Sequence, residues 1–349
     1  MARAPAAVSA PLEFSAERLQ AYLRREIPGL EGQMRLERVG GGQSNPTFYV
    51  SFDNRALVLR KRPVGANLLP FAHAVDREYR ILNALAGSDV PVPKTVLFCA
   101  SEDLIGTPFY LMERLDGRIL THFSLPEVRR EERRAMYFSM AESLARLHGV
   151  DWAARGLADY GKPDKNYYAR QLVRLKKQWD MTKLEDNPDI DRLMDWLPRH
   201  LPPPEETTVI HGDFRFGNLM FHATEPRVIA ILDWELSTLG PPLNDIAFSC
   251  MHWHTGPDEF GGILGLDLEA LGIPTREEYL DHYRLAGGSD RRLTVFHLAY
   301  ALCRISILFD GIGSRGRDGS AAGKEAAEYG ALAPRMARRG VEVLEAAGA

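Results

Sequence analysis

Two short apolar segments in the second half of the chain each lead into an aspartate, and this feature most constrains the fold. Val209-Ile210 precedes Asp213, and Ile229 to Leu232 precedes Asp233. Short apolar runs bounded by polar or turn residues are typical of buried strands. Because strands are rigid elements that can present charged groups to a cleft, we expect both carboxylates at the ends of paired strands.

The first third of the chain is predicted to be rich in strands. Two of these strands flank a glycine loop, Gly40 to Asn45. One helix is also predicted in this part of the chain, and Glu78 lies on its apolar stripe. This pattern of strand, glycine loop and strand is typical of a small sheet. The predicted strands are 34–39, 47–52, 56–60 and 109–112, and the predicted helix is 73–86.

After Asp116-Gly117 the pattern changes to helices with a β-rich insert. Pro126 precedes a long amphipathic helix that Gly149 ends. The other predicted helices are 167–179, 189–200, 276–285, 293–309 and 321–346, and the strands of the insert are 207–210, 219–221 and 228–232. We therefore predict an α+β fold of two lobes: a leader and helix in 1–33, a small β-rich lobe in 34–114, and a larger, mainly helical lobe in 115–349.

Composition excludes several classes of protein. The net charge of -4 does not favour a nucleic-acid partner. Three scattered cysteines form neither a disulfide framework nor a zinc pair, which favours a reducing, cytoplasmic setting. The first 11 residues lack the apolar core of a signal peptide. The apolar stretch 293–309 is interrupted by His297 and Arg304 and is expected to be too short to span a membrane.

The polar residues after the two strands predict phosphoryl transfer. Asn218 follows Asp213, and Glu235 follows Asp233. Carboxylate and amide oxygens suit Mg²⁺, and phosphoryl transfer needs one Asp near the acceptor hydroxyl and an Asp with an Asn to hold metal. We therefore assign Asp213 as the catalytic base or hydroxyl-orienting residue. Asn218, Asp233 and Glu235 are the expected Mg²⁺ ligands.

The same residues carry a resemblance to a family. His211 to Asn218 has the spacing His-x-Asp-x-x-x-x-Asn of the kinase catalytic loop, and Asp233-Trp234-Glu235 stands where kinases have Asp-Phe-Gly. The strings VIHGDFRFGNLMF and AILDWELSTLGPPLNDIAF resemble the aminoglycoside phosphotransferase and choline kinase-like superfamily. They are most similar to the branch that includes kinase-like domains fused to some acyl-CoA dehydrogenases. The resemblance runs from about Glu37 to about Arg315.

The resemblance implies a protein-kinase-like fold that binds ATP, and it assigns further roles. The backbone of Glu113 and Leu115 would bind adenine. Asp245 would brace the catalytic loop, and His211 would tie that loop together. The loop that would cover the phosphates consists of Gly41, Gly42, Gln43, Ser44 and Asn45.

One position departs from the kinase pattern. Kinases hold the phosphates with a lysine on the third strand, paired to a helix glutamate. Alternation with Val58 places Arg60 at that position and turns Lys61 the other way. Glu78 on an apolar stripe needs a cationic partner, for which Arg60 is the first candidate. A shift of one residue would make Lys61 the partner instead.

The acceptor is the least constrained part of the prediction. No acidic cluster favours an aminoglycoside, and no aromatic cage favours choline. A small molecule with a hydroxyl group is expected, possibly a hydroxyacyl-CoA on the strength of the resemblance. The alternative is a catalytically silent nucleotide-binding module. Cys250 to His254 could suggest zinc, but without a second ligand cluster a packing role is favoured. The sequence carries no signal for oligomeric state.

Overall fold

The computed structural model describes residues 14–39, 45–63, 74–163, 166–183, 185–317 and 323–349. The chain divides into two compact units. The first unit comprises Met1–Arg118 and Ala230–Glu235, and the second comprises Ile119–Ile229 and Leu236–Ala349. The short segment that carries Asp233 therefore belongs to the first unit, although it lies far along the sequence.

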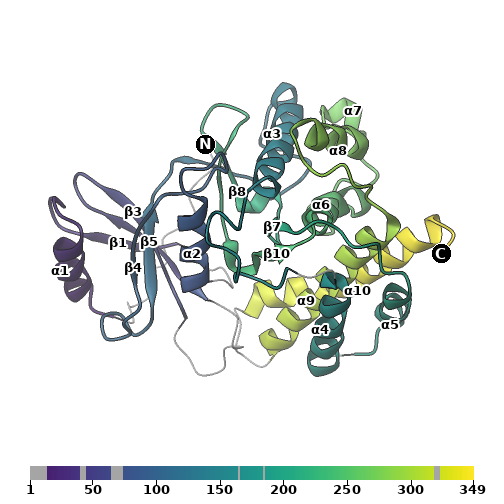
Figure 1. Ribbon diagram of the computed structural model, residues 1–349, viewed down its shortest axis with the longest axis horizontal. Helices are drawn as coiled ribbons and strands as arrows, with labels where there is room; N and C mark the ends of the chain where they lie inside the picture. Colours follow the sequence, from purple (N-terminus) through teal and green to yellow (C-terminus); the bar gives the residue numbers. More distant parts are fainter. Residues whose placement is uncertain (1–13, 40–44, 64–73, 164–165, 184, 318–322) are drawn as a thin grey trace. The chain divides into compact units, whose positions relative to one another are not determined.

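The first unit is built on an antiparallel sheet of five strands, in the order β1-β2-β3-β5-β4. Helix α1 (Ala16–Glu26) begins at Ser15, whose side chain accepts a hydrogen bond from the amide of Arg18 and so caps the helix. Helix α2 (Val75–Leu85) packs on β4 and β5. Figure 1 shows both helices beside the sheet. The strands are β1 (Arg35–Arg38), β2 (Thr47–Ser51), β3 (Ala56–Lys61), β4 (Thr95–Cys99) and β5 (Phe109–Glu113).

Alternation along β3 separates the two faces of this sheet. Leu57 and Leu59 are buried in one core with Leu19 and Leu23 of α1. Successive side chains of a strand point to opposite faces, so Arg60 faces the side of α2 and Lys61 faces the side of α1. Strand β4 was not predicted, because only one of its residues is fully buried and its polar flanks weaken the pattern.

The second unit is mainly helical (Figure 1). A two-stranded sheet pairs β7 (Thr208–Ile210) with β10 (Thr238–Gly240), and β8 (Leu219–His222) lies between β6 (Gly117–Ile119) and β9 (Val228–Ile231) in a three-stranded sheet. The helices are α3 (Arg130–His148), α4 (Tyr167–Thr182), α5 (Pro188–Trp196), α6 (Pro242–Cys250), α7 (Leu268–Leu271), α8 (Arg276–Leu285), α9 (Val295–Arg317) and α10 (Gly323–Ala346).

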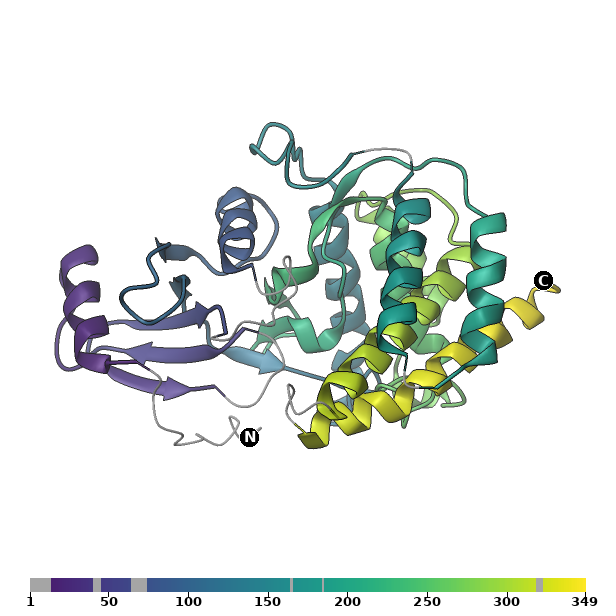
Figure 2. The same cartoon turned by 90° about the horizontal axis from the view of Figure 1, so that it is seen from below.

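The last two helices lie side by side (Figure 2). A Cβ added to Gly313 would stand 2.8 Å from the Cα of Gly330, so glycines allow this close approach. Helix α9 has 23 residues, which corrects the expectation that the apolar stretch ends at Phe309 and is too short to span a membrane. By length and composition it is the one candidate span within the described residues, but 72% of its most apolar window is buried in the protein, as in a core helix.

The predicted α+β class is confirmed, with a strand-rich first unit and a helical second unit. The elements that sequence reasoning missed are short. They include β6 and β10, with three residues each, and the four-residue helix α7. Such elements depend on hydrogen bonds to distant segments, which leave little periodicity in the local sequence. Cys99, Cys250 and Cys303 are free and buried.

Candidate active site

An ion pair joins β3 to α2 in the first unit. The Nε of Arg60 lies 3.3 Å from Oε2 of Glu78, and both side chains are buried. Glu78 also accepts hydrogen bonds from the Tyr110 hydroxyl, at 2.9 Å, and from the Asn45 side-chain amide. The pairing predicted by strand alternation is therefore confirmed for Arg60. Lys61 is buried on the other face, with its ammonium 5.6 Å from the Phe14 ring centre.

The surroundings raise the pKa of both members of this pair. Burial lowers the pKa of Arg60, but Glu78, Tyr110 and Asp233 more than offset this, so the pKa lies above its ordinary value. Burial raises the pKa of Glu78 above its ordinary value, and Arg60 only partly opposes that rise. A buried carboxylate needs a cation and hydrogen-bond donors to remain ionised, and Arg60, Tyr110 and Asn45 supply them. The contacts with Glu78 hold the Arg60 side chain in one orientation.

Asp233 follows β9 in a strained backbone conformation. Its φ is +64°, a left-handed value that non-glycine residues seldom adopt. Its Oδ1 accepts a hydrogen bond of 3.0 Å from Nη2 of Arg60. Glu235 follows in a short 3₁₀ turn, which the buried indole of Trp234 anchors by donating to the carbonyl of Ile231 at 2.9 Å. Backbone strain of this kind tends to occur at functional sites.

The predicted catalytic loop leaves β7 in the second unit and is braced by Asp245. The amides of His211 and Gly212 donate to the two carboxylate oxygens of Asp245, at 2.6 and 2.8 Å. The amide of Asp213 donates to Nδ1 of His211 at 3.2 Å. Both bracing roles implied by the resemblance are therefore seen in the contacts. Arg304, on α9, adds a hydrogen bond of 2.7 Å to the carbonyl of Gly212.

Asp245 is a buried carboxylate held ionised by its neighbours. Burial alone would raise its pKa, but hydrogen bonds from His148 and from the backbone of His211 lower it below the ordinary value. Nε2 of His148 lies 3.5 Å from Oδ2 of Asp245, and its Nδ1 lies 2.7 Å from the Tyr283 hydroxyl. His148 was not among the predicted site residues. Nothing in the apolar pattern of α3 distinguishes it, because its partner lies 97 positions further along the chain.

Asp213 is oriented by two side chains of its own loop. The amide nitrogen of Asn218 donates to Oδ2 and to the carbonyl of Asp213, at 2.7 and 2.8 Å. Nε of Arg215 lies 3.4 Å from Oδ1, and its guanidinium lies 5.0 Å from the Phe260 ring centre. The loop therefore holds the Asp213 carboxylate in a defined direction while leaving it partly exposed. Arg215 was not predicted, although it stands inside the motif.

The contacts of Asn218 also define which of its atoms could bind a cation. Since its nitrogen points at Asp213, its amide oxygen points away and is the atom left for a ligand. An amide oxygen is one of the oxygen donors that Mg²⁺ prefers, and the side chains of Asp233 and Glu235 also carry oxygen donors. Asn218 belongs to the second unit and the two acids to the first. Among the described residues, no three His, Cys, Asp or Glu side chains form a metal cluster.

The structure describes only some of the residues that were predicted to bind the phosphates and adenine. Gly41, Gly42, Gln43 and Ser44 lie outside the described residues, so the structure does not test the phosphate loop; its last member, Asn45, is described. The Glu113 amide donates to the carbonyl of Lys94 at 2.9 Å and so is not available to a nucleotide. That leaves the carbonyl of Glu113 and the backbone of Leu115 for adenine.

The segment suspected of binding zinc packs in the core. The His252 ring stacks on Phe123 with 3.6 Å between ring centres, and burial places its pKa well below the ordinary value. A neutral histidine stacked in this way is a packing residue. The neighbours of its ring are aromatic side chains and not a group of zinc ligands.

Comparison with known proteins places the chain among phosphotransferases. The model of the phosphotransferase enzyme family matches residues 35–287. A solved protein from Ralstonia eutropha, provisionally assigned as an aminoglycoside phosphotransferase, is 43% identical with a TM-score of 0.84, over 95% of this chain and 99% of that one. A thermostable mutant of the aminoglycoside phosphotransferase APH(4)-Ia, solved in complex with AMP-PNP and hygromycin B, is 17% identical with a TM-score of 0.61, over 93% of this chain and 98% of that one.

A curated relative is a larger protein. Acyl-CoA dehydrogenase family member 10 of mouse is 42% identical over 91% of this chain, and the match covers 30% of that protein. The chain therefore spans less than half the length of this relative. The resemblance stated from the sequence motifs is confirmed, and so is the kinase-like fold.

Proposed function

Because this chain belongs to the phosphotransferase enzyme family, we propose that it transfers the γ-phosphoryl group of ATP to a hydroxyl group of a small molecule. The observation that carries this proposal is the geometry of Asp213. Its carboxylate is held by Asn218 and Arg215 at the end of β7, on a loop whose backbone is fixed by Asp245. Such a group can accept the proton of an acceptor hydroxyl without rearranging.

In the proposed reaction the acceptor oxygen forms a bond to the γ-phosphorus while the bond from that phosphorus to the oxygen of ADP breaks. The proton of the hydroxyl passes to a carboxylate oxygen of Asp213. The loop contributes orientation: a positioned base typically accelerates such a step by about 10²–10⁴. The Arg215 guanidinium, whose Nε lies 3.4 Å from Oδ1, helps to hold this carboxylate in place.

Magnesium and the phosphates are assigned to named side chains. Asn218, Asp233 and Glu235 are the proposed ligands of Mg²⁺, which when bound neutralises charge on the phosphates. Arg60 is the proposed phosphate-binding cation. Its guanidinium has five N–H donors in a fixed fork, and its contacts with Glu78 and Asp233 use Nε and Nη2. The remaining donors are suited to phosphate oxygens. AMP-PNP, an ATP analogue, is bound in the APH(4)-Ia structure, which supports ATP as the nucleotide here.

For the acceptor we propose a hydroxyacyl-CoA or a similar hydroxylated metabolite. The support is similarity to an acyl-CoA dehydrogenase family member, a protein whose name refers to acyl-CoA chemistry. An aminoglycoside is a weaker candidate, because the acids of α8 are neutralised by arginines. Glu278 pairs with Arg134 and Asp281 pairs with Arg284, so this helix does not offer a surplus of negative charge to a polycation.

One observation keeps a second function under consideration. Arg60, which replaces the usual lysine, is tied to Asp233, a proposed metal ligand. A module that binds nucleotide without turning it over could keep this ion pair. The two functions differ in turnover but not in nucleotide binding.

The experiment measures ADP formation and product mass with Mg²⁺-ATP and a panel of acceptors: hydroxyacyl-CoAs of several chain lengths, free CoA, choline and an aminoglycoside. We expect turnover with a hydroxyacyl-CoA and a loss of about 10²–10⁴ in Asp213→Asn. Asp195→Asn, at an exposed acid of α5 paired with Arg199, is the matched control and should keep full activity. Saturable AMP-PNP binding without turnover of any acceptor would favour the silent module. Equal turnover in Asp213→Asn would reject the catalytic assignment.

A further inference from the structure

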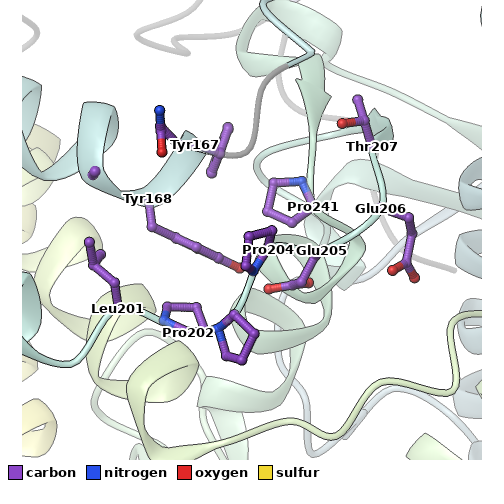
Figure 3. A pocket seen from close by; sticks show the side chains of 12 residues that line it. Tyr167, Tyr168, Leu201, Pro202, Pro204, Glu205, Glu206, Thr207 and Pro241 are labelled. Carbon is purple, nitrogen blue, oxygen red and sulfur yellow. The ribbon is translucent and has the colours of Figure 1, made fainter.

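A pocket of about 160 Å³ lies within the second unit (Figure 3). It is bounded by the start of α4, the segment 201–207 and Pro241. That segment enters β7 at Thr208, whereas the loop with Asp213 leaves β7 after Ile210. The pocket and the candidate active site are therefore at opposite ends of one strand.

Glu205 places a buried carboxylate in this pocket. Its side chain is 4% exposed, and Oε1 lies 3.1 Å from Nε2 of His297. The other oxygen, Oε2, is fully buried and has no hydrogen-bond partner among the described residues. A buried carboxylate is stable only when both oxygens are satisfied. Half of this group is therefore available to a ligand.

His297 donates one hydrogen bond to Glu205. The amide of Thr294, a group that can only donate, lies 3.2 Å from Nδ1 of His297. Nδ1 must therefore be the acceptor, and the ring proton is on Nε2, where it is donated to Glu205. This ring supplies one hydrogen bond to Oε1 of Glu205, and Oε2 is left for a second donor.

Tyr168 adds a second polar atom that lacks a partner. Its hydroxyl is buried with no hydrogen-bond partner in the described part of the chain, and its ring meets the His297 ring edge-on at 5.5 Å. Burial, and next the charge of Glu205, place the pKa of Tyr168 well above its ordinary value, so the phenol keeps its proton. Figure 3 shows its hydroxyl end and the Glu205 carboxylate directed into the same space.

Prolines form a large part of the remaining wall, beside polar residues such as Asn166 and Thr207. Pro202, Pro204 and Pro241 line it (Figure 3), and prolines have no N–H to donate. The neighbouring acid, Glu206, already has partners, since its Oε2 lies 3.5 Å from Nε of Arg291 and its Oε1 accepts from Ser289. The Glu205 carboxylate thus faces a small cavity partly walled by prolines, and a buried carboxylate is stabilised by a cation.

We propose that this pocket binds a small organic ammonium ion. The ammonium would donate to Oε2 of Glu205 and to the Tyr168 oxygen, and a short alkyl body would lie against the prolines. The volume equals about five water molecules at ~30 Å³ each, which suits a chain of a few carbon atoms. A bare metal ion is less well matched, because Mg²⁺ and Ca²⁺ need several oxygen ligands, whereas the atoms without a partner here are one carboxylate oxygen and one phenol oxygen.

The test uses n-propylammonium as the probe on the full chain. Binding is followed by ligand-detected NMR titration and by the shift in melting temperature, at constant ionic strength, beside n-propanol, NaCl and KCl. We expect saturable binding of n-propylammonium only. Glu205→Gln should weaken it at least tenfold, and Tyr168→Phe should weaken it less. Glu225→Gln, at an exposed acid paired with Arg227, should leave it unchanged.

Glu205→Gln also separates this proposal from a purely structural role. A glutamine oxygen can still accept from Nε2 of His297, so the variant should melt at the same or a higher temperature than the wild type without probe. Failure of n-propylammonium to saturate, an unchanged affinity in Glu205→Gln, or an equal response to K⁺, Na⁺ or n-propanol would overturn the proposal. So would a large loss of stability in Glu205→Gln. ATP turnover is assayed separately, since the pocket does not include Asp213.

Discussion

Arg60 and Lys61 are adjacent in β3, yet only Arg60 reaches Glu78, with 3.3 Å between Nε and Oε2. Lys61 is equally buried but lies on the face of α1, near Phe14. The pleat of the strand therefore decides which cation meets the helix glutamate. The two residues can be tested against each other, because they have the same sign of charge and similar burial.

Removal of Arg60 should destabilise the first unit. In Arg60→Met the Glu78 carboxylate stays buried without its cation, which should lower the free energy of unfolding by about 3–5 kcal/mol. The double variant Arg60→Met with Glu78→Met should regain much of this loss, because no unpaired charge remains. Urea unfolding of the wild type, both single variants and the double variant measures the coupling. Strict additivity of the two single effects would show that the pair is not coupled.

Substitution of Lys61 should leave nucleotide affinity nearly unchanged, whereas substitution of Arg60 should weaken it. Lys61→Met removes a cation from the α1 face and keeps the Arg60 contacts, so affinity for AMP-PNP should stay near that of the wild type. Arg60→Lys should weaken affinity for AMP-PNP at least tenfold, because an ammonium cannot reproduce the forked contacts to Glu78 and Asp233. Calorimetric titration of both variants compares them. A greater loss of AMP-PNP affinity in Lys61→Met would reverse the assignment.

Much of the site could be predicted because its residues are close in sequence or related by strand periodicity. Asp213 and Asn218 are five positions apart, and the contact between them follows from one loop. The pairing of Arg60 with Glu78 follows from alternation in β3 and from an acid on an apolar stripe. In both cases a local rule of backbone geometry carries the inference. These rules apply before any tertiary contact is known.

The remainder depends on contacts that have no local signal. His148 is an ordinary residue of an amphipathic helix until α3 is placed beside Asp245. Glu205 follows three prolines, in a segment that has no periodicity, and its burial appears only once His297 of α9 is in place. The φ of +64° at Asp233 also has no local signal. Nothing in the surrounding sequence marks this position as one that needs a left-handed backbone. Long-range packing decides each of these features.

Asp245→Asn should change how stability depends on pH. The folded pKa of Asp245 lies below the ordinary 3.8. Its ionised form therefore stabilises the fold above about pH 4, and this contribution is lost as pH falls through the folded pKa. The asparagine can accept from only one of the amides of His211 and Gly212 through its single oxygen, which should cost about 1–3 kcal/mol at pH 7.

The gap in unfolding free energy between the wild type and Asp245→Asn should narrow as pH falls below 4, because only the wild type loses an ionised group. Urea unfolding at pH 7, 4 and 3 measures it. Asp195→Asn, at an exposed acid, is the control and should show little difference at any pH. A gap for Asp245→Asn that does not change with pH would mean that Asp245 does not act through its charge.

Gly212 should be needed for both its backbone angle and its lack of a side chain. Its φ is +84°, and an added Cβ would lie 2.6 Å from the carbonyl oxygen of Leu236, a backbone atom that cannot easily move. Gly265 has nearly the same φ, +82°, but open space around it. Gly265→Ala should therefore cost only the left-handed strain, about 1–2 kcal/mol. Gly212→Ala should cost more and should also reduce turnover at least tenfold, because the shift needed to relieve the clash moves Asp213. Thermal unfolding and ATP turnover of the two variants make the comparison, and equal effects in both would mean that the Leu236 contact does not position the loop.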